Sequence, residues 1–165
     1  MRFLKLGLIS FAFLSIVVTA LSMLLPSTIN ISRAIDVQAP KDRVYNLVND
    51  FDNWNEWYDN YQPSEVTFPG VVSGKGATVI MGKTKVSHLE SSSDRIQTRW
   101  ETPNDTLIGE FNFYTNSPGQ TTIQWHFSYK VKWYPWEKFA SIVSDKTIGG
   151  SMEKSLDNLK KAAEK

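Results

Sequence analysis

The sequence predicts an α+β fold: a strongly curved antiparallel sheet of about seven strands, two short helices after the first strand, and one long C-terminal helix over the sheet. Polar and apolar residues alternate with a period of two in 29–37 and repeatedly between 64 and 131, as in half-buried strands. The connecting segments are short and rich in Gly, Pro, Asn and Ser, which favours hairpins. From residue 136 onward, apolar residues recur with helical spacing.

The composition suits one domain with a hydrophobic core. The chain has 165 residues, of which 41% are hydrophobic, and a net charge of +1. A near-neutral chain of mixed charge argues against nucleic-acid binding, which normally requires a basic surface. Because the chain has no Cys, disulfides, thiol nucleophiles and Cys-based metal sites are excluded. The sequence predicts no cofactor.

Residues 1–27 are predicted to be a membrane anchor. Arg2 and Lys5 precede an uncharged, mostly apolar run over residues 6–25. As a helix this run would be about 30 Å long, which matches the hydrocarbon core of a bilayer. Basic residues favour the cytoplasmic side, so the N-terminus should remain in the cytoplasm.

The domain over residues 28–165 should then lie on the extracytoplasmic side of the membrane. The alternative is a signal peptide with the small residues 18–20 as its cleavage site, which would give a secreted or periplasmic protein. The apolar run continues over residues 21–25, where a signal peptide would already be polar. This continuation favours an uncleaved anchor.

The first part of the domain is predicted to be a strand followed by two short helices. Arg33 shares one face of the strand with apolar residues at 29, 31, 35 and 37. Pro40 suits the first turn of the helix that follows. The second short helix should be capped by Asp50 or Asp52 and should carry an aromatic stripe formed by Phe51, Trp54, Trp57, Tyr58 and Tyr61.

Six further strands and one long helix complete the prediction. The strands are expected within 64–70, 76–82, 84–91, 95–102, 106–115 and 120–131. The terminal helix should contain about 28 residues and reach about 42 Å, enough to cross a small sheet. Gly149 and Gly150 are expected to interrupt it, because each glycine costs about 1 kcal/mol relative to alanine in a helix.

Two stretches carry a family resemblance. The first, ISRAIDVQAPKDRVYNLVNDFDNWNEWYD, has an Ala-Pro start to the first helix and a Trp-x-x-Trp at Trp54 and Trp57. The second, TIGGSMEKSLDNLKKAAEK, has a Gly pair followed by Ser155-Leu156 and Leu159-Lys160. Over about residues 29–164 the chain resembles the START-like superfamily, and within it the polyketide cyclase/dehydrase and lipid-transport (SRPBCC) group.

This resemblance implies a helix-grip fold that encloses a ligand cavity between the sheet, the short helices and the long helix. The aromatic stripe is then expected to roof one end of the cavity, whereas an aromatic core without a void is the alternative. Members of the group bind or modify many ligands, and some carry an N-terminal anchor. The candidate ligand contacts are Arg33, Trp54, Trp57, Tyr58, Tyr61, Thr98, Trp100, Phe111, Phe113, Trp125, Phe127, Tyr129 and Met152.

Arg33 and the two histidines are the polar residues that need an explanation. A charge on an apolar strand face needs a partner. Arg33 should therefore extend to water or form an ion pair at the rim, or else bind a ligand carboxylate or phosphate. Glu101 and Glu110 are possible partners, although alternation places neither on that face. His126 is expected to face solvent, and the orientation of His88 is left open by the alternation. Their spacing does not suggest a metal site.

The segment over residues 131–139, VKWYPWEKF, joins the last strand to the long helix. Its Trp133, Tyr134 and Trp136 lie between lysines, a composition found at membrane interfaces. The alternative is that these rings close the end of the cavity. The sequence leaves both possibilities open.

The leading hypothesis is a membrane-anchored domain that binds a small hydrophobic or amphipathic, lipid-like molecule. One alternative is a polyketide cyclase or dehydratase type of enzyme, and another is an envelope interaction module without a ligand. The sequence has no recognisable nucleophile with an adjacent base, and the Gly-rich segment 74–84 lacks the spacing of a phosphate-binding loop. No catalytic residue is therefore predicted.

Overall fold

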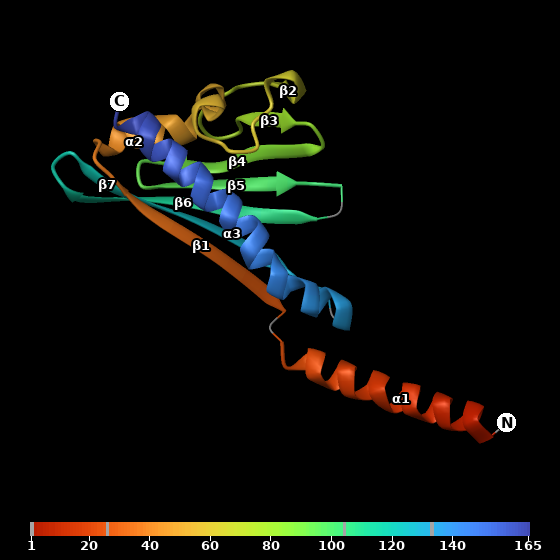
Figure 1. Ribbon diagram of the computed structural model, residues 1–165. Coiled ribbons are helices and arrows are strands. Elements are labelled where there is room, and N and C mark those ends of the chain that lie inside the picture. Colours follow the sequence, from red (N-terminus) through yellow and green to blue (C-terminus); the bar gives the residue numbers. More distant parts are fainter. Residues whose placement is uncertain (1, 26, 104, 133) are drawn as a thin grey trace.

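A computed structural model of the chain describes residues 2–25, 27–103, 105–132 and 134–165. The described residues form three α-helices, two short 3₁₀ helices and seven strands, and the strands make one sheet (Figure 1). In chain order the elements are α1 (Arg2–Met23), β1 (Thr28–Val37), α2 (Lys41–Asn49), the 3₁₀ helices η1 (Phe51–Glu56) and η2 (Pro63–Glu65), β2 (Val66–Thr67), β3 (Thr78–Met81), β4 (Thr84–Ser92), β5 (Arg95–Glu101), β6 (Thr106–Ser117), β7 (Gln120–Lys130) and α3 (Pro135–Ala163).

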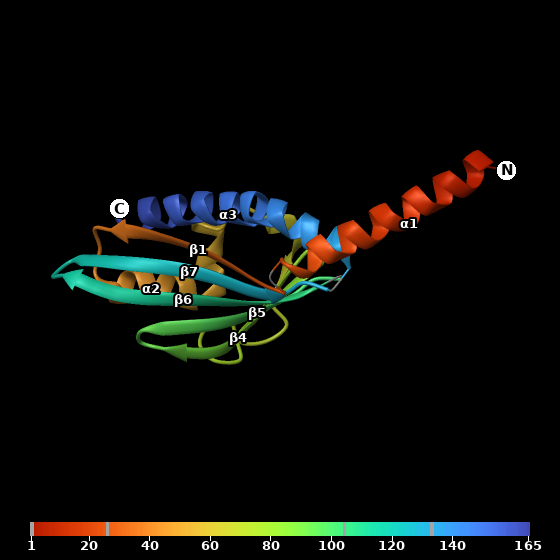
Figure 2. The same ribbon diagram turned by 90° about the horizontal axis from the view of Figure 1, so that it is seen from below.

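The predicted helix-grip fold is confirmed. The seven strands are antiparallel and lie in the order β1-β7-β6-β5-β4-β3-β2, so the first strand pairs with the last. Strands β3 to β7 follow one another as a meander, as their short loops predicted. Helix α3 lies along one face of the curved sheet, and α2 lies near the end of that face where the chain terminates (Figures 1 and 2).

The alternation in β1 and β7 places their apolar side chains beneath α3. Ile31 and Val37 are fully buried, and Ile31 is opposite Phe127 in the register of the two strands. On β7 the inward residues Ile123, Trp125 and Phe127 are buried, while their neighbours are half-buried on the other face. These faces agree with the period-two prediction.

The aromatic stripe begins on a 3₁₀ helix and not on the α-helix that its spacing suggested, and Trp57, Tyr58 and Tyr61 come after the end of that helix. With three residues per turn, η1 brings Phe51 and Trp54 to the same side, and both are buried. The predicted cap is present, because the Asp50 carboxylate accepts a hydrogen bond from the Asp52 N–H at 3.0 Å. The strand expected over 64–70 is shorter, with Pro63 starting a 3₁₀ turn and only Val66–Thr67 pairing at the sheet edge.

Helix α3 runs without interruption through Gly149 and Gly150, contrary to the expected break. Its 29 residues correspond to about 44 Å. Gly149 is buried where the helix crosses β1, and a Cβ atom there would lie 2.3 Å from Nη2 of Arg33. The glycine therefore provides space for a side chain of the sheet.

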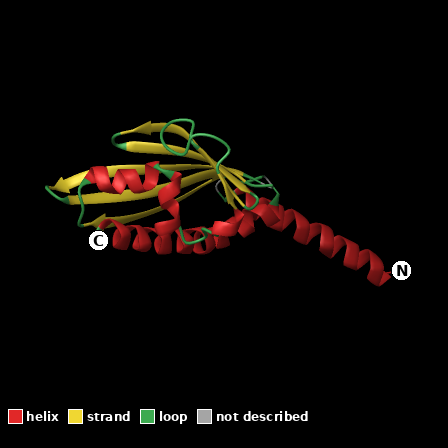
Figure 3. Ribbon diagram, turned by 90° about the horizontal axis from the view of Figure 1, so that it is seen from above, coloured by secondary structure: helices red, strands yellow, loops and turns green. Residues whose placement is uncertain are grey.

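Helix α1 extends away from the sheet and exposes its apolar side chains (Figures 1 and 3). Its segment Phe3–Met23 is long and apolar enough to span a membrane or to act as a signal sequence. The boundary between this helix and the domain at residue 28 stays a prediction.

Candidate functional site

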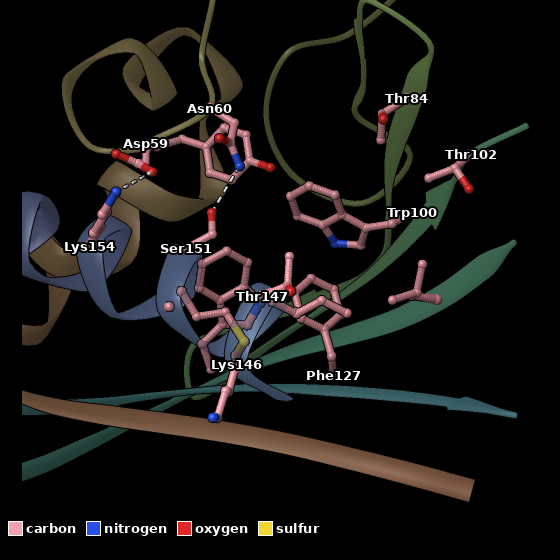
Figure 4. Close-up of a pocket in the computed structure, with 16 residues that line it drawn as sticks. Asp59, Asn60, Thr84, Trp100, Thr102, Phe127, Lys146, Thr147, Ser151 and Lys154 are labelled. Carbon is pink, nitrogen blue, oxygen red and sulfur yellow. Dashed lines mark hydrogen bonds and ion pairs between the residues drawn. The ribbon is translucent and has the colours of Figure 1, made fainter. Parts of the chain in front are cut away.

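A cavity of about 660 Å³ lies between the inner face of the sheet and α3, next to the loop that follows η1 (Figure 4). It occupies the end of the sheet where β1 begins, since it reaches Thr84 at the start of β4 and Thr102 just after β5. The lining residues are Tyr58, Asp59, Asn60, Thr84, Trp100, Thr102, Leu107, Trp125, Phe127, Lys146, Thr147, Ile148, Gly150, Ser151, Met152 and Lys154.

Three aromatic rings from β5 and β7 form the sheet side of the cavity. The ring centroids of Trp100, Trp125 and Phe127 lie 5.2 to 6.1 Å apart. Because these strands are antiparallel neighbours of β6 and residues two apart point the same way, the rings gather on one face. Ile148 and Met152 supply apolar contacts from α3. The interior is therefore suited to an apolar group.

The orientation of Trp100 is fixed by its neighbours. Its indole N–H donates to Oγ1 of Thr98 at 2.9 Å, and the Thr98 hydroxyl donates to the carbonyl of Gly109 at 3.1 Å. A Cβ atom on Gly109 would lie 2.9 Å from Trp100 Nε1 and 2.6 Å from Thr98 Oγ1. Glycine at this position thus allows the indole to lie across β6, and Thr98 acts by positioning the wall of the cavity.

The rim of the cavity is polar. Asn60 Nδ2 donates to Ser151 Oγ at 2.8 Å, and the Asp59 carboxylate lies 4.0 Å from the Lys154 ammonium (Figure 4). The backbone N–H of Asp59 also donates to Ser155 Oγ at 3.0 Å. Each of these contacts contributes about 1 kcal/mol or less, so they hold the loop to α3 only weakly.

Tyr58 is the member of the aromatic stripe that reaches the cavity. Its ring lies 5.6 Å from Trp100 and 5.5 Å from Trp54, between the cavity wall and the core. Burial raises the pKa of the Tyr58 phenol, so the group stays protonated near neutral pH. It can therefore offer a ligand a neutral hydrogen-bonding group but not a phenolate base.

Comparison with known proteins establishes the family. The profile of the family described as polyketide cyclase / dehydrase and lipid transport matches residues 28–164. The chain belongs to this family. A search of curated proteins found no match.

Solved structures show the same fold as this polyketide cyclase/dehydrase-family domain at low sequence identity. A protein of Nitrosospira multiformis has a TM-score of 0.64 and 13% identity, with 82% of this chain and 96% of that chain covered. A protein of Thermobifida fusca has a TM-score of 0.61 and 18% identity, covering 79% and 90%. A protein of Chromobacterium violaceum has a TM-score of 0.58 and 17% identity, covering 85% and 99%.

The cavity of this family member brings together some of the predicted site residues. Tyr58, Trp100, Trp125, Phe127 and Met152 line it, whereas Phe111 and Phe113 are buried in the core behind the wall. Phe111 stacks on Trp125 with ring centroids 4.8 Å apart. Tyr61 is half-buried against the core, and the buried hydroxyl of Tyr129 has no hydrogen-bond partner among the described residues.

Trp54 and Trp57 lie behind the cavity wall instead of roofing the cavity. They are 0% and 1% exposed, and neither is among the described lining residues. Their indole N–H groups donate to the carbonyls of Val48 at 2.9 Å and Leu47 at 2.8 Å. These carbonyls belong to the last turn of α2, which has no helical partners for them. The two indoles thus join η1 to α2.

Arg33 is paired within the protein. Its Nε lies 2.6 Å from Glu153 Oε1 and its Nη2 lies 3.3 Å from Asp145, both on α3, and these carboxylates raise its pKa. The partners suggested by the sequence, Glu101 and Glu110, pair with Lys85 and Arg95 instead. Alternation within strands gives no information on which helix residues lie above a strand, which explains the difference.

The two histidines lie apart from the cavity. His126 is half-buried on the outer face of β7, whereas His88 is 2% exposed and packs on Phe51 with ring centroids 4.2 Å apart. Burial lowers the pKa of His88 to about 4. Within the described part of the chain, no three His, Asp or Glu side chains gather as a metal site.

The residues at the rim were not predicted. The rim residues of α3 could have been found from the sequence. They recur at helical spacing next to the apolar stripe, and they are Thr147, Gly150, Ser151 and Lys154. For Asp59 and Asn60 the sequence carries no such period. Their place at the rim depends on how the loop meets α3.

Proposed function

We propose that this protein binds a small hydrophobic or amphipathic, lipid-like ligand in the cavity between the sheet and α3, and that α1 anchors it to a membrane. The observation that carries the proposal is a cavity of about 660 Å³ with aromatic side chains inside and polar groups at its rim. Ligand pockets typically have volumes of about 300–1,000 Å³ and combine apolar walls with a few polar groups.

The distribution of polar groups favours one orientation of the ligand. An apolar chain or ring would lie against Trp100, Trp125 and Phe127, where it removes apolar surface from water. A polar head would lie at the rim, where Lys146 is exposed and Asn60 and Ser151 offer amide and hydroxyl groups. Such a ligand is amphipathic, like a fatty acid or a phospholipid.

The chemistry of the lining supports binding over catalysis. The raised pKa of Tyr58 disfavours a phenolate, and the carboxylate of Asp59 is engaged with Lys154. Cyclase or dehydratase activity would require an acid or base aimed at the ligand. The cavity also disfavours the alternative of a filled interaction module.

Gly150 offers a direct test. It lines the cavity, its position has open space around a Cβ atom, and its backbone is helical. Gly150→Trp should fill part of the cavity and leave the helix intact. Gly70→Trp is the matched control, because Gly70 also has open space around it but lies in an exposed loop outside the lining.

The measurement is mass spectrometry of organic extracts from full-length protein purified in mild detergent. Wild type and Gly70→Trp should carry the same hydrophobic molecule in similar amounts, and Gly150→Trp should carry clearly less while melting at a similar temperature. The proposal fails if the wild type carries no such molecule, or if Gly150→Trp retains as much as the control.

A further inference from the structure

The start of α3 is fixed to the end of α1. The Lys138 side chain is 4% exposed, and its ammonium donates to the carbonyl of Leu25 and to Oγ of Ser27, both at 2.8 Å. The Leu25 carbonyl lies just beyond the C-terminus of α1, where unpaired carbonyls carry partial negative charge and favour a cation. The Val131 N–H also donates to the Ser27 carbonyl at 2.9 Å, so the end of β7 is held at the same point.

Large aromatic side chains are exposed beside this junction. Trp136 is 66% exposed and Phe139 is 43% exposed, and they share a side of α3 because they are three residues apart. The ring of Tyr134 stacks on Trp136 with centroids 5.0 Å apart and planes at 3°. Lys138 points to a different side of the helix, toward α1. These rings therefore add little to the core of the domain.

The position of these rings relative to α1 identifies what would cover them. If α1 spans a bilayer, the Leu25 carbonyl lies near the membrane–water boundary, and Lys138 shares that depth. Trp136 and Phe139 are within one helical turn, about 5.4 Å of helix axis, of Lys138. Aromatic rings are favoured at this depth, and exposed lysine side chains such as Lys132 can extend from it into water.

We propose that Tyr134, Trp136 and Phe139 form a membrane-docking surface that holds the domain against the same bilayer that α1 crosses. The occupant of this surface is the lipid interface, because the start of α3, which carries these rings, lies beside the end of the apolar helix α1 (Figures 1 and 2). The domain then has two attachments to the membrane, and its orientation is restricted.

This docking also places the cavity close to the membrane. The cavity occupies the end of the sheet near α1, the end that carries the docking surface. A lipid could then move between the bilayer and the cavity without crossing the full depth of water around the domain. This consequence rests on the proposed ligand-binding function, whereas the docking surface itself does not.

The absence of cysteine from the sequence allows single spin labels to test the docking. The substitutions are Trp136→Cys and Phe139→Cys, made separately in the full chain. Tyr114→Cys is the matched control, because Tyr114 is also an exposed aromatic residue, 52% exposed, but lies near the opposite end of the sheet. Each labelled protein is reconstituted into phosphatidylcholine vesicles, and relaxation by oxygen is compared with relaxation by a water-soluble nickel chelate.

Labels at 136 and 139 should be relaxed more by oxygen, which concentrates in the bilayer, and should be shielded from nickel. The label at 114 should show the reverse. Thermal melts of the three labelled proteins check that each is folded. Nickel accessibility at either 136 or 139 equal to that at 114 would overturn the docking surface. Because no ligand enters this measurement, its failure would leave the test of the cavity unaffected.

Discussion

The adjacent glycines of α3 should respond in opposite ways to the same substitution. Both lie in the helix interior, where alanine is favoured over glycine by about 1 kcal/mol. A Cβ atom on Gly150 would have no neighbour within 4 Å, whereas one on Gly149 would lie 2.3 Å from Nη2 and 2.8 Å from Cζ of Arg33. Gly150→Ala should therefore stabilise the protein, and Gly149→Ala should not.

The magnitudes follow from these contacts. Gly150→Ala should raise the free energy of unfolding by about 1 kcal/mol, which corresponds to about 3 °C in Tm for a domain of this size. In Gly149→Ala the guanidinium of Arg33 must move away from Glu153 and Asp145. Their side chains are 60% and 56% exposed, so each ion pair contributes up to about 1 kcal/mol. Gly149→Ala should then range from neutral to about 1 kcal/mol destabilising.

A double-mutant cycle assigns this difference to Arg33. In an Arg33→Ala background both the obstacle and the ion pairs are absent, so Gly149→Ala should stabilise by about 1 kcal/mol, as Gly150→Ala does. The coupling between the two positions should be about 1–2 kcal/mol. Thermal and denaturant melts of the detergent-solubilised full chain provide the free energies. Equal stabilisation by Gly149→Ala and Gly150→Ala in the wild-type background would refute the reasoning.

Three further predictions follow from the buried aromatic residues and from α1. Because the folded pKa of His88, about 4, is below its unfolded value of 6.5, its contribution is complete above pH 6.5 and is lost as the pH falls toward 4. Melts should show that the free energy of unfolding falls by about 2 kcal/mol between pH 7 and about pH 5. His88→Phe should abolish this part of the pH dependence. Trp57→Ala should lower the free energy of unfolding by about 3–5 kcal/mol and unfold the domain, whereas the Tyr58→Ala protein should remain folded and lose bound lipid. Melts and lipid extracts that show the reverse pattern would contradict the assigned positions. A reporter that is active only in the cytoplasm, fused after Lys165, should be silent, and an active fusion would reverse the predicted topology.

The order of elements was predictable because it depends on local patterns. The alternation of polar and apolar residues predicted the strands. It also correctly placed Ile31, Arg33 and Val37 on one face of β1. The failures concern contacts between elements. The carboxylates that pair with Arg33 lie on α3, more than 100 residues further along the chain, and nothing in the period of β1 indicates them. The 3₁₀ geometry of η1 was missed because an aromatic spacing of three suits both helix types over one or two turns.

The position of the cavity depends on where large side chains are missing from α3. Toward the C-terminus of the helix, Leu156 and Leu159 are buried against the core and fill the space above the sheet. One to two turns earlier, the helix presents Gly150 and Ser151 to the cavity, and these are too small to reach the rings of the sheet. The aromatic stripe that suggested a cavity is mostly core, because aromatic residues fill space as readily as they line it. The small residues Gly150 and Ser151, beside the apolar face of α3, are therefore the more informative sequence signal for the cavity, whereas the space left by Gly149 is taken by Arg33.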